Sequence, residues 1–296
     1  MRIATCTYND LVHLAVVQDN SVLFPENCKG WPEEINSTLE LIDSGEETLH
    51  ILRKIISEAN SDQWLPLSQV ELISPIPRPR QNIMCLGWNY IEHVEETSGK
   101  AIEAPKLPKY PIVFTKAASS MNGPYADIPV DLEVSDKMDW EVELAVIIGK
   151  TGERISRASA LDHVFGYSII NDVSARDMQK RHKQFFVGKS FTGACPMGPW
   201  IVTSDEIADP QNLNLSSRVN GESKQDSNTK YQIFDVASVI ETLSKGMTLE
   251  AGDIIATGTP SGVGYVRNPP EYLMPGDVVE CEIERIGKIS NSIVAK

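Results

Sequence analysis

The sequence predicts an α+β protein in which a small N-terminal α/β domain precedes a larger domain built around antiparallel sheets. Alternating prolines in Ser74–Arg80 lock φ and remove hydrogen-bond donors, which is typical of an extended linker. After this segment, short apolar or alternating runs separated by Gly and Pro outnumber the stretches with helical spacing. We therefore expect an α/β domain at residues 1–74 and an α+β domain at residues 75–296.

Residues 1–74 show three strand-like runs followed by apolar residues at near-helical spacing. The strand-like runs are Ile3–Tyr8, Leu11–Gln18 and Ser21–Phe24. The helical spacing covers residues 35–59, and we expect Ser44-Gly45 to divide it into two helices. This part contains no convergent set of reactive side chains, so we expect the chemistry to lie in the larger domain.

The larger domain is predicted to be mostly β. Its strand-like runs are Asn82–Leu86, Pro111–Thr115, Trp140–Ile148, Val164–Ile170, Trp200–Thr203, Ser217–Asn220, Asp253–Thr257 and Asp277–Ile283. The two best helix candidates are Ala158–His163 and Val236–Leu243, and Asp235 is a suitable N-cap for the second.

Charge and cysteine content restrict the partners and the compartment. The 296 residues include 27 Lys+Arg against 41 Asp+Glu, a formal net charge of −14. A field of this sign repels phosphate backbones and anionic lipid, so we expect no nucleic-acid or membrane partner. An anionic substrate would then need local cations or a bound metal. Five cysteines without a C-x-x-C pair, and the lack of a signal-peptide pattern or a long apolar run, favour the cytoplasm.

Two carboxylates share one face of a predicted strand. In the run 140–149, a period of two puts Glu141 and Glu143 side by side on a partly apolar face. Like charges this close require a countercharge, and Asp172 ends the next strand-like run. Three oxygen ligands without His or Cys suit Mg²⁺, Mn²⁺ or Ca²⁺. The alternative, which is favoured for an isolated E-x-E pair, is the exposed face of an edge strand.

Other polar side chains accompany these acids. One helical turn would place His93 and Glu96 on the same face, where the carboxylate orients the imidazole as a general base. The alternative is a surface helix with ordinary charges. Arg176 and Gln179 follow Asp172 by one and two turns, a spacing that suits the clamping of a carboxylate near a metal.

Three further segments bear on anion binding. Lys189, next to a glycine, is either an ammonium that stabilises an enolate or oxyanion, or a surface lysine. The run Lys180–Lys183 is expected to be a solvated basic patch. Thr257–Gly264 lacks the Gly-Lys pair of a P-loop and the G-x-S-x-G elbow, but its hydroxyls and backbone amides suit a carboxylate.

Five ordered motifs after the linker carry a resemblance to a known family. They are Glu141-x-Glu143; Asn171-Asp172 with Ala175-Arg176-Asp177-x-Gln179; Gly188-Lys189-Ser190-Phe191; Pro196-Met197-Gly198-Pro199; and Ala256-Thr257-Gly258-Thr259-Pro260-x-Gly262-Val263-Gly264. Together they resemble the fumarylacetoacetate hydrolase (FAH) family. Within it, the chain is similar to the bacillary YisK-like branch, whose members also carry a small N-terminal domain.

The resemblance implies a fold, an assembly and a set of site residues. The fold is a C-terminal mixed β-sandwich roll, and the assembly is a homodimer. The implied ligands of one Mg²⁺ or Mn²⁺ per chain are Glu141, Glu143 and Asp172. The implied catalytic residues are Lys189 and, on a mobile lid, His93 and Glu96. The implied substrate contacts are Arg176, Gln179 and Thr259.

The resemblance also implies metal-dependent cleavage of a C–C bond in a small dicarboxylate or 2-oxo (2,4-dioxo) acid, by an acylpyruvate hydrolase or an oxaloacetate-type decarboxylase. Cleavage would leave a metal-bound enolate whose charge Lys189 shares, and the His93–Glu96 pair would activate water in hydrolysis. Two alternatives stay open: an isomerase or hydratase of 2-hydroxy-dienoates, and a catalytically weak metal- and ligand-binding interaction protein of the same fold. The lack of His ligands disfavours a zinc hydrolase.

Overall fold

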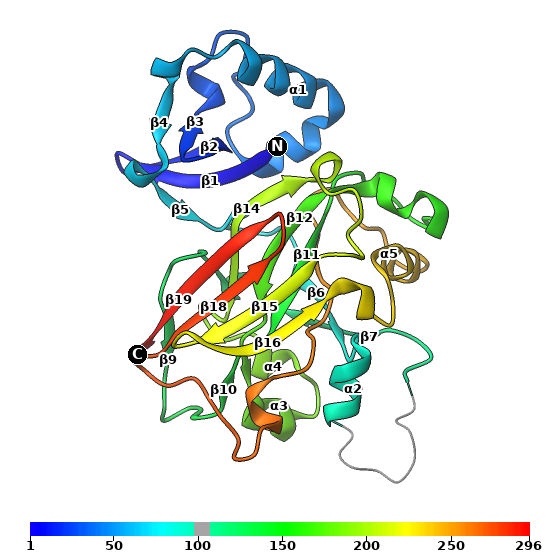
Figure 1. Ribbon diagram of the computed structural model, residues 1–296. Coiled ribbons are helices and arrows are strands. Elements are labelled where there is room, and N and C mark those ends of the chain that lie inside the picture. Colours follow the sequence, from blue (N-terminus) through cyan, green and yellow to red (C-terminus); the bar gives the residue numbers. More distant parts are fainter. Residues whose placement is uncertain (98–106) are drawn as a thin grey trace.

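Three sheets carry the fold in the computed structural model, which describes residues 1–97 and 107–296 (Figure 1). The largest sheet runs in the order β4 (Trp64–Pro66), β3 (Ser21–Leu23), β2 (Leu11–Gln18), β1 (Arg2–Tyr8), β14 (Cys195–Thr203), β12 (Val164–Asn171), β11 (Val142–Ile148), β17 (Ile254–Ala256), β6 (Ile83–Gly87) and β7 (Ile112–Lys116). Two short strands lie off this path: β5 (Glu71–Ile73) pairs with β1, and β8 (Met121–Asn122) pairs with β14.

The other two sheets are smaller. One runs in the order β16 (Glu222–Asn228), β15 (Asn214–Val219), β18 (Val278–Ile283), β19 (Gly287–Ala295) and β9 (Ile128–Val130), and the other pairs β10 (Met138–Asp139) with β13 (Ser174–Ala175). Most neighbours are antiparallel, whereas β6–β17, β8–β14 and β9–β19 are parallel. The α+β class that the sequence predicts and the mixed β-sandwich roll that the family resemblance implies are confirmed.

Five α-helices complete the described part of the chain: α1 (Thr38–Glu58), α2 (Ile91–Thr97), α3 (Arg176–His182), α4 (Phe186–Lys189) and α5 (Val236–Ser244). The 3-10 turns are Pro25–Asn27, Ser61–Gln63, Leu67–Gln69, Ala118–Ser120, Arg157–His163, Ser204–Glu206, Thr229–Tyr231 and Gly264–Val266. Asp235 caps α5 as predicted by accepting from the Ser238 backbone N–H, whereas the predicted helix at Ala158–His163 is a 3-10 turn. In the ranges 1–97 and 107–296, no helix combines the length and apolar character needed to cross a bilayer.

Alternate residues of β11 enter different hydrophobic cores, as the period of two predicts. The core shared with α5 and the five-stranded sheet takes up Val142, Leu144, Val146 and Ile148. The core shared with α1 takes up Ala145 and Ile147. Glu143 lies on this second face, between cores that exclude water on both sides of the strand.

The N-terminal strands, at the top of Figure 1, continue the large sheet. β1 pairs with β2 along its length and with β14 through Arg2↔Val202 and Ile3↔Ile201. Gly45 interrupts α1 with φ 72° and ψ −162°, which confirms the predicted break there. Ile76, in the predicted linker, is fully buried in the core that α1 shares with β11. The division into two domains at residue 74 stays a prediction. The β1–β14 pairing and the core that α1 shares with β11 both contain residues from the two sides of this boundary.

Candidate active site and metal centre

Three acidic side chains converge where β11 begins and β12 ends. The two strands are antiparallel with Val142 opposite Asn171, so Glu141 and Asp172 flank adjacent strand ends. One carboxylate oxygen from each of Glu141, Glu143 and Asp172 lies within 4.8 Å of the others, and all three side chains are buried. Because β11 lies between β12 and β17, the alternative of an exposed edge strand is wrong.

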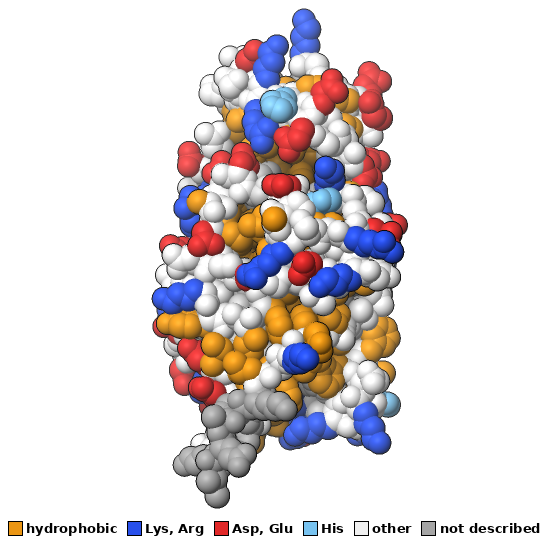
Figure 2. Space-filling model, turned by 90° about the vertical axis from the view of Figure 1, so that its right-hand side faces the viewer, with side chains coloured by type: hydrophobic (Ala, Val, Ile, Leu, Met, Phe, Trp, Pro, Cys, Tyr) orange, Lys and Arg blue, Asp and Glu red, His pale blue; other side chains and the backbone are white. Residues whose placement is uncertain are grey.

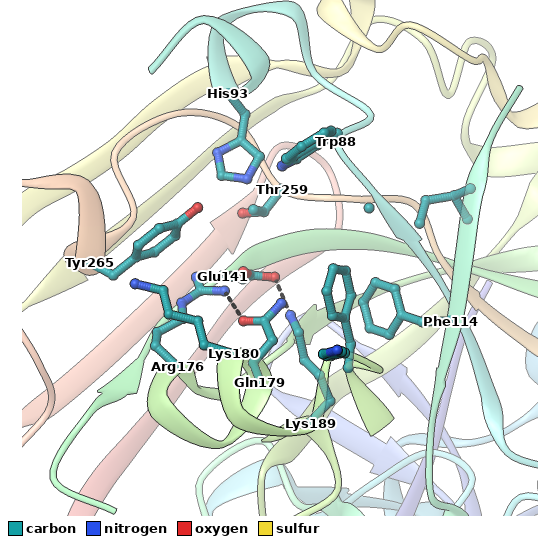
Figure 3. A pocket seen from close by; sticks show the side chains of 14 residues that line it. Trp88, His93, Phe114, Glu141, Arg176, Gln179, Lys180, Lys189, Thr259 and Tyr265 are labelled. Atoms are coloured by element: carbon teal, nitrogen blue, oxygen red, sulfur yellow. Dashed lines mark hydrogen bonds and ion pairs between the residues drawn. The ribbon is translucent and has the colours of Figure 1, made fainter. Parts of the chain in front are cut away.

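Buried ammonium groups contact two of these acids. Lys189 Nζ lies 2.7 Å from Glu141 Oε2 (Figure 3) and 2.7 Å from Asp172 Oδ2. Lys116, fully buried at the end of β7, donates to Asp172 Oδ1 at 2.7 Å and to the Val173 carbonyl at 3.0 Å. Burial alone would lower the pKa of Lys189, but Asp172 and Glu141 outweigh it and raise the pKa, so the ammonium stays charged. The surface-lysine alternative for Lys189 is therefore wrong.

Each nitrogen of the Arg176 guanidinium lies close to a protein oxygen, although Nη2 makes no hydrogen bond of acceptable geometry in the described part of the chain. Its Nε donates to Asp139 Oδ2 at 2.8 Å, its Nη1 donates to Gln179 Oε1 at 3.1 Å, and its Nη2 lies 2.6 Å from Glu141 Oε1. Burial alone would raise the pKa of Glu141, but Lys189 and Arg176 lower that pKa to about 2. Arg176 thus holds Glu141 ionised, and its charge is already balanced by protein carboxylates.

Glu143 has no cation of its own. Its Oε2 accepts a 2.7 Å hydrogen bond from the Gly258 backbone N–H, and within residues 1–97 and 107–296 it makes no ion pair. Burial and the charges of Asp172 and Glu141 raise the pKa of Glu143 well above its ordinary value. Mg²⁺ and Mn²⁺ bind carboxylate oxygens, and three carboxylates within 4.8 Å of one another would suit such an ion. The donor set and the charge balance both fit one hard divalent cation.

Helix α2 brings the predicted His93–Glu96 pair to the same region. His93 Nδ1 lies 2.8 Å from Glu96 Oε1, and the ring points toward the cavity described below (Figure 3). Glu96 also accepts from the Gly262 backbone N–H at 3.0 Å, while Ser261 Oγ donates to Glu92 Oε2 at 3.2 Å. Gly262 has φ 101°, and a Cβ there would lie 2.1 Å from a backbone carbonyl oxygen, so the turn requires glycine. Two carboxylates therefore anchor α2 to the segment after β17.

A cavity of about 280 Å³ lies beside these groups (Figure 3). Its lining consists of Leu86, Gly87, Trp88, His93, Phe114, Glu141, Arg176, Gln179, Lys180, Lys183, Phe185, Lys189, Thr259 and Tyr265. Six of the predicted site residues are in this lining, whereas Glu96, Glu143 and Asp172 are not. Thr259 Oγ1 donates to the Val142 carbonyl at 3.0 Å and accepts from Gln225 Nε2 at 2.7 Å, so its hydroxyl is held by the protein.

Known proteins of one family are similar to this chain. Residues 82–294 match the family described as "Fumarylacetoacetate (FAA) hydrolase C-terminal". The chain belongs to the fumarylacetoacetate hydrolase family. This finding confirms the resemblance predicted from the five motifs. Among the FAH-family relatives, "Oxaloacetate tautomerase YisK" of Bacillus subtilis (strain 168) is 51% identical over 227 residues, which cover 77% of this chain and 74% of the relative.

Solved structures of similar proteins cover the whole chain. "Fumarylacetoacetate hydrolase (EaFAH)" from psychrophilic Exiguobacterium antarcticum is 39% identical, with a TM-score of 0.85 and 100% of each chain covered. Maleylpyruvate hydrolase from Sphingobium sp. SYK-6, solved with manganese(II) and pyruvate, is 30% identical, with a TM-score of 0.79, 100% of this chain and 99% of the other covered. The FAH fold therefore extends over the N-terminal strands as well as the matched family segment.

Sequence reasoning on this FAH-family chain missed several residues of the site. They are Lys116, Asp139, Lys180, Lys183 and Tyr265. Asp139 accepts from Arg176 Nε and from the backbone N–H groups of Gly264 and Tyr265, and so joins α3 to the 264–266 turn. One step further along the period of two from Glu141 and Glu143 would have found Asp139. A lysine that ends a strand carries no comparable signal, because exposed strand ends commonly carry lysine.

Proposed function

We propose that this chain is a divalent-metal-dependent enzyme that interconverts the keto and enol forms of oxaloacetate or a similar 2-oxo dicarboxylate. One observation carries the proposal: three buried carboxylates suited to a hard cation lie beside a cavity toward which His93, held by Glu96, also points. The 51% identity to a relative named oxaloacetate tautomerase supports this reaction over the others considered.

We assign one Mg²⁺ or Mn²⁺ per chain to Glu141, Glu143 and Asp172, and the manganese in the maleylpyruvate hydrolase relative supports this assignment. When bound, the ion supplies positive charge that holds the 2-oxo acid and stabilises negative charge on its 2-oxo oxygen. Lys189 uses two of its three N–H donors on Glu141 and Asp172, which leaves the third for the substrate oxygen. Because Lys189 stays protonated, its role is a fixed positive charge and not a base.

We assign the proton transfer to His93. Glu96 accepts the Nδ1–H, which leaves the lone pair of Nε2 for the substrate. Nε2 takes the proton from C3 of the keto acid and returns it to the 2-oxo oxygen, so one base moves one proton and only the C3–H bond breaks. The rings of Trp88, Phe114 and Phe185 line the same cavity and limit the access of bulk water.

The C–C bond cleavage expected from the sequence is the second candidate. In hydrolysis of an acylpyruvate, His93 would activate water against the acyl carbonyl, and the maleylpyruvate hydrolase relative favours this candidate. In decarboxylation of oxaloacetate, the same charges would stabilise the enolate that remains after loss of CO₂. Isomerisation or hydration of 2-hydroxy-dienoates and a purely binding role are further alternatives.

We also propose that the chain forms a homodimer, as the family resemblance implies. Hydrophobic side chains gather on the face that carries α2 and β7 (Figure 2). β7 ends the large sheet, and its Ile112 and Val113 are 37% and 42% exposed. An exposed apolar edge strand can pair with another chain, and exposed apolar patches mark interaction sites. Sedimentation as a monomer at micromolar concentration would contradict the dimer.

The reaction is tested with a substrate panel of oxaloacetate, acetylpyruvate and fumarylpyruvate in Mg²⁺ or Mn²⁺. The enol absorbance reports tautomerisation, and product analysis for pyruvate and CO₂ reports cleavage. We expect faster keto–enol exchange of oxaloacetate with the carbon skeleton intact, and no activity in Glu141→Ala. Glu153→Ala, at an exposed acid, is the matched control. Pyruvate formation at a rate that exceeds exchange would favour the cleavage candidate, and full activity in metal-stripped protein would overturn both.

A further inference from the structure

The buried cations of the site are already balanced. Lys189 contacts Glu141 and Asp172, and Lys116 contacts Asp172 as well. Arg176 contacts Glu141 and Asp139 through two of its nitrogens. Together with a divalent ion, these groups neutralise the carboxylates and bind the 2-oxo acid end of a substrate. The far end of a longer anion needs other positive charges, because the net charge of −14 repels it.

Lys180 and Lys183 supply two such charges. Both line the cavity, both are exposed, and neither makes an ion pair within the described ranges 1–97 and 107–296. Lys180 Nζ lies 5.6 Å from the centroid of the Tyr265 ring, and the Arg176 guanidinium lies 4.4 Å from the same centroid. In Figure 3 the Lys180 ammonium extends beside Tyr265, on the side of the cavity that Arg176 and Gln179 also border. The tyrosine ring thus holds an unpaired cation against the cavity wall.

The backbone turn at Lys183 is unusual. Lys183 follows α3 with φ 60° and ψ −38°, and the Gln184 N–H donates to the His182 carbonyl at 2.6 Å, which closes a three-residue turn. A γ-turn with positive φ is rare and strained for a residue that has a Cβ. Glycine would relieve this strain, yet the sequence has lysine at the position, and its side chain lines the cavity beside Phe185.

We propose that Lys180 and Lys183 bind the distal carboxylate of the substrate, and so select 2-oxo dicarboxylates over 2-oxo acids with a neutral tail. The inference rests on the proposed function, in which the metal site holds the opposite end of the molecule. Trp88, Phe114 and Phe185 give the cavity enough apolar surface for a neutral tail, so the two lysines add affinity only when the tail is negative.

The test compares oxaloacetate with its 4-methyl ester, which keeps the 2-oxo acid end and loses the distal charge. The double variant Lys180→Gln/Lys183→Gln should lower kcat/KM for oxaloacetate by about 10- to 100-fold, mainly by raising KM. Its kcat/KM for the ester should change by less than about twofold. Lys180→Arg/Lys183→Arg should restore most of the preference. Arg181→Gln is the matched control, because Arg181 lies on the same helix but outside the cavity lining. This variant should leave kcat/KM unchanged for both substrates.

Binding of 3,3-difluorooxaloacetate in Mg²⁺, measured by calorimetry, separates this inference from the proposed reaction, because the probe has no C3 hydrogen and cannot enolise. If the wild-type protein turns over no 2-oxo acid but the glutamine double variant still binds the probe at least about tenfold more weakly, the reaction is wrong and the lysine assignment stands. Three results would overturn the assignment of the two lysines. They are an equal loss of kcat/KM for oxaloacetate and the ester in the glutamine double variant, no loss for either substrate, and no binding of the probe by the wild-type protein.

Discussion

Glu143 and Gly258 form the one hydrogen bond that the Glu143 carboxylate makes within residues 1–97 and 107–296, a 2.7 Å contact from the Gly258 backbone N–H to Oε2. Gly258 has φ +92°, a conformation that residues with a side chain rarely adopt. A neutral donor orients Glu143 but does not balance its charge. The chain therefore positions this acid for a cation that is not a side chain.

The first prediction concerns pH. Burial and the charges of Asp172 and Glu141 raise the pKa of folded Glu143, so between its unfolded and folded pKa values the folded state keeps a proton that the unfolded state has released. The free energy of unfolding of metal-free protein should then fall as pH rises, by up to about 1.4 kcal/mol per pH unit from this group. Glu143→Gln should remove that contribution. Urea unfolding in EDTA at several pH values measures how steeply the free energy of unfolding falls with pH in wild type and in Glu143→Gln. Equal slopes for the two proteins would contradict the raised pKa of Glu143.

The second prediction concerns Lys116. Lys116→Met should lower the free energy of unfolding by about 3 to 5 kcal/mol, because it leaves the buried Asp172 carboxylate without one of its two ammonium partners. Lys150→Met, at an exposed lysine, should stay within about 0.5 kcal/mol of wild type. Denaturant unfolding of both variants provides the comparison. Equal stability of the two would show that Lys116 is not needed to balance Asp172.

The third prediction separates the two roles of Gly258, which are to adopt a positive φ and to donate the hydrogen bond to Glu143. Gly258→Ala places a Cβ 2.8 Å from Asn89 Cβ at φ +92°, whereas Gly30→Ala meets nothing within 4 Å at φ +89°. Both variants should lose about 1 to 2 kcal/mol from backbone strain, and Gly258→Ala should lose more from the clash. Only Gly258→Ala should also weaken metal binding, because Glu143 loses its orienting hydrogen bond. Unchanged Mn²⁺ affinity in Gly258→Ala would argue against that orienting role.

The fourth prediction concerns helix α2. Glu96 accepts from both His93 Nδ1 and the Gly262 N–H, so Glu96→Gln should disturb the imidazole tautomer and lower kcat for oxaloacetate tautomerisation by roughly 10²-fold. Glu95→Gln is the control, because Glu95 is the exposed neighbour of Glu96 and the substitution removes the same negative charge. Steady-state kinetics of both variants measure the difference in kcat. Identical kinetics of the two variants would remove His93 from the assigned role.

Local patterns predicted the elements that carry the metal ligands. The period of two placed both faces of β11 correctly, and the Gly45 break and the Asp235 cap follow from backbone chemistry that acts within a few residues. β16 was missed because every residue of Glu222–Asn228 is polar, and Gln225 is buried by contacts that include Val142, Thr259 and the Pro260 carbonyl. A strand of this composition has no alternation that a sequence pattern can detect.

Long-range pairing could not be predicted. β1 joins β14 across about two hundred residues of sequence, and no local signal encodes that register. The exposed basic run at Lys180–Lys183 agrees with the sequence expectation, yet two of its members line the cavity, Lys180 from within α3 and Lys183 from the turn that follows it. The burial of Lys116 depends likewise on Asp172, which is 56 residues away. Such features arise from the assembled fold and not from the residues around them.

A divalent ion at Glu141, Glu143 and Asp172 is the central requirement of the proposed function. The most direct measurement is a titration of metal-free protein with Mn²⁺, followed by electron paramagnetic resonance, in wild type, Glu143→Gln and the exposed control Glu153→Gln. We predict one bound ion per chain in wild type and control, and an affinity at least about 10²-fold weaker in Glu143→Gln. A wild-type protein that binds no Mn²⁺, or a Glu143→Gln variant that binds it as tightly as wild type, would contradict the account.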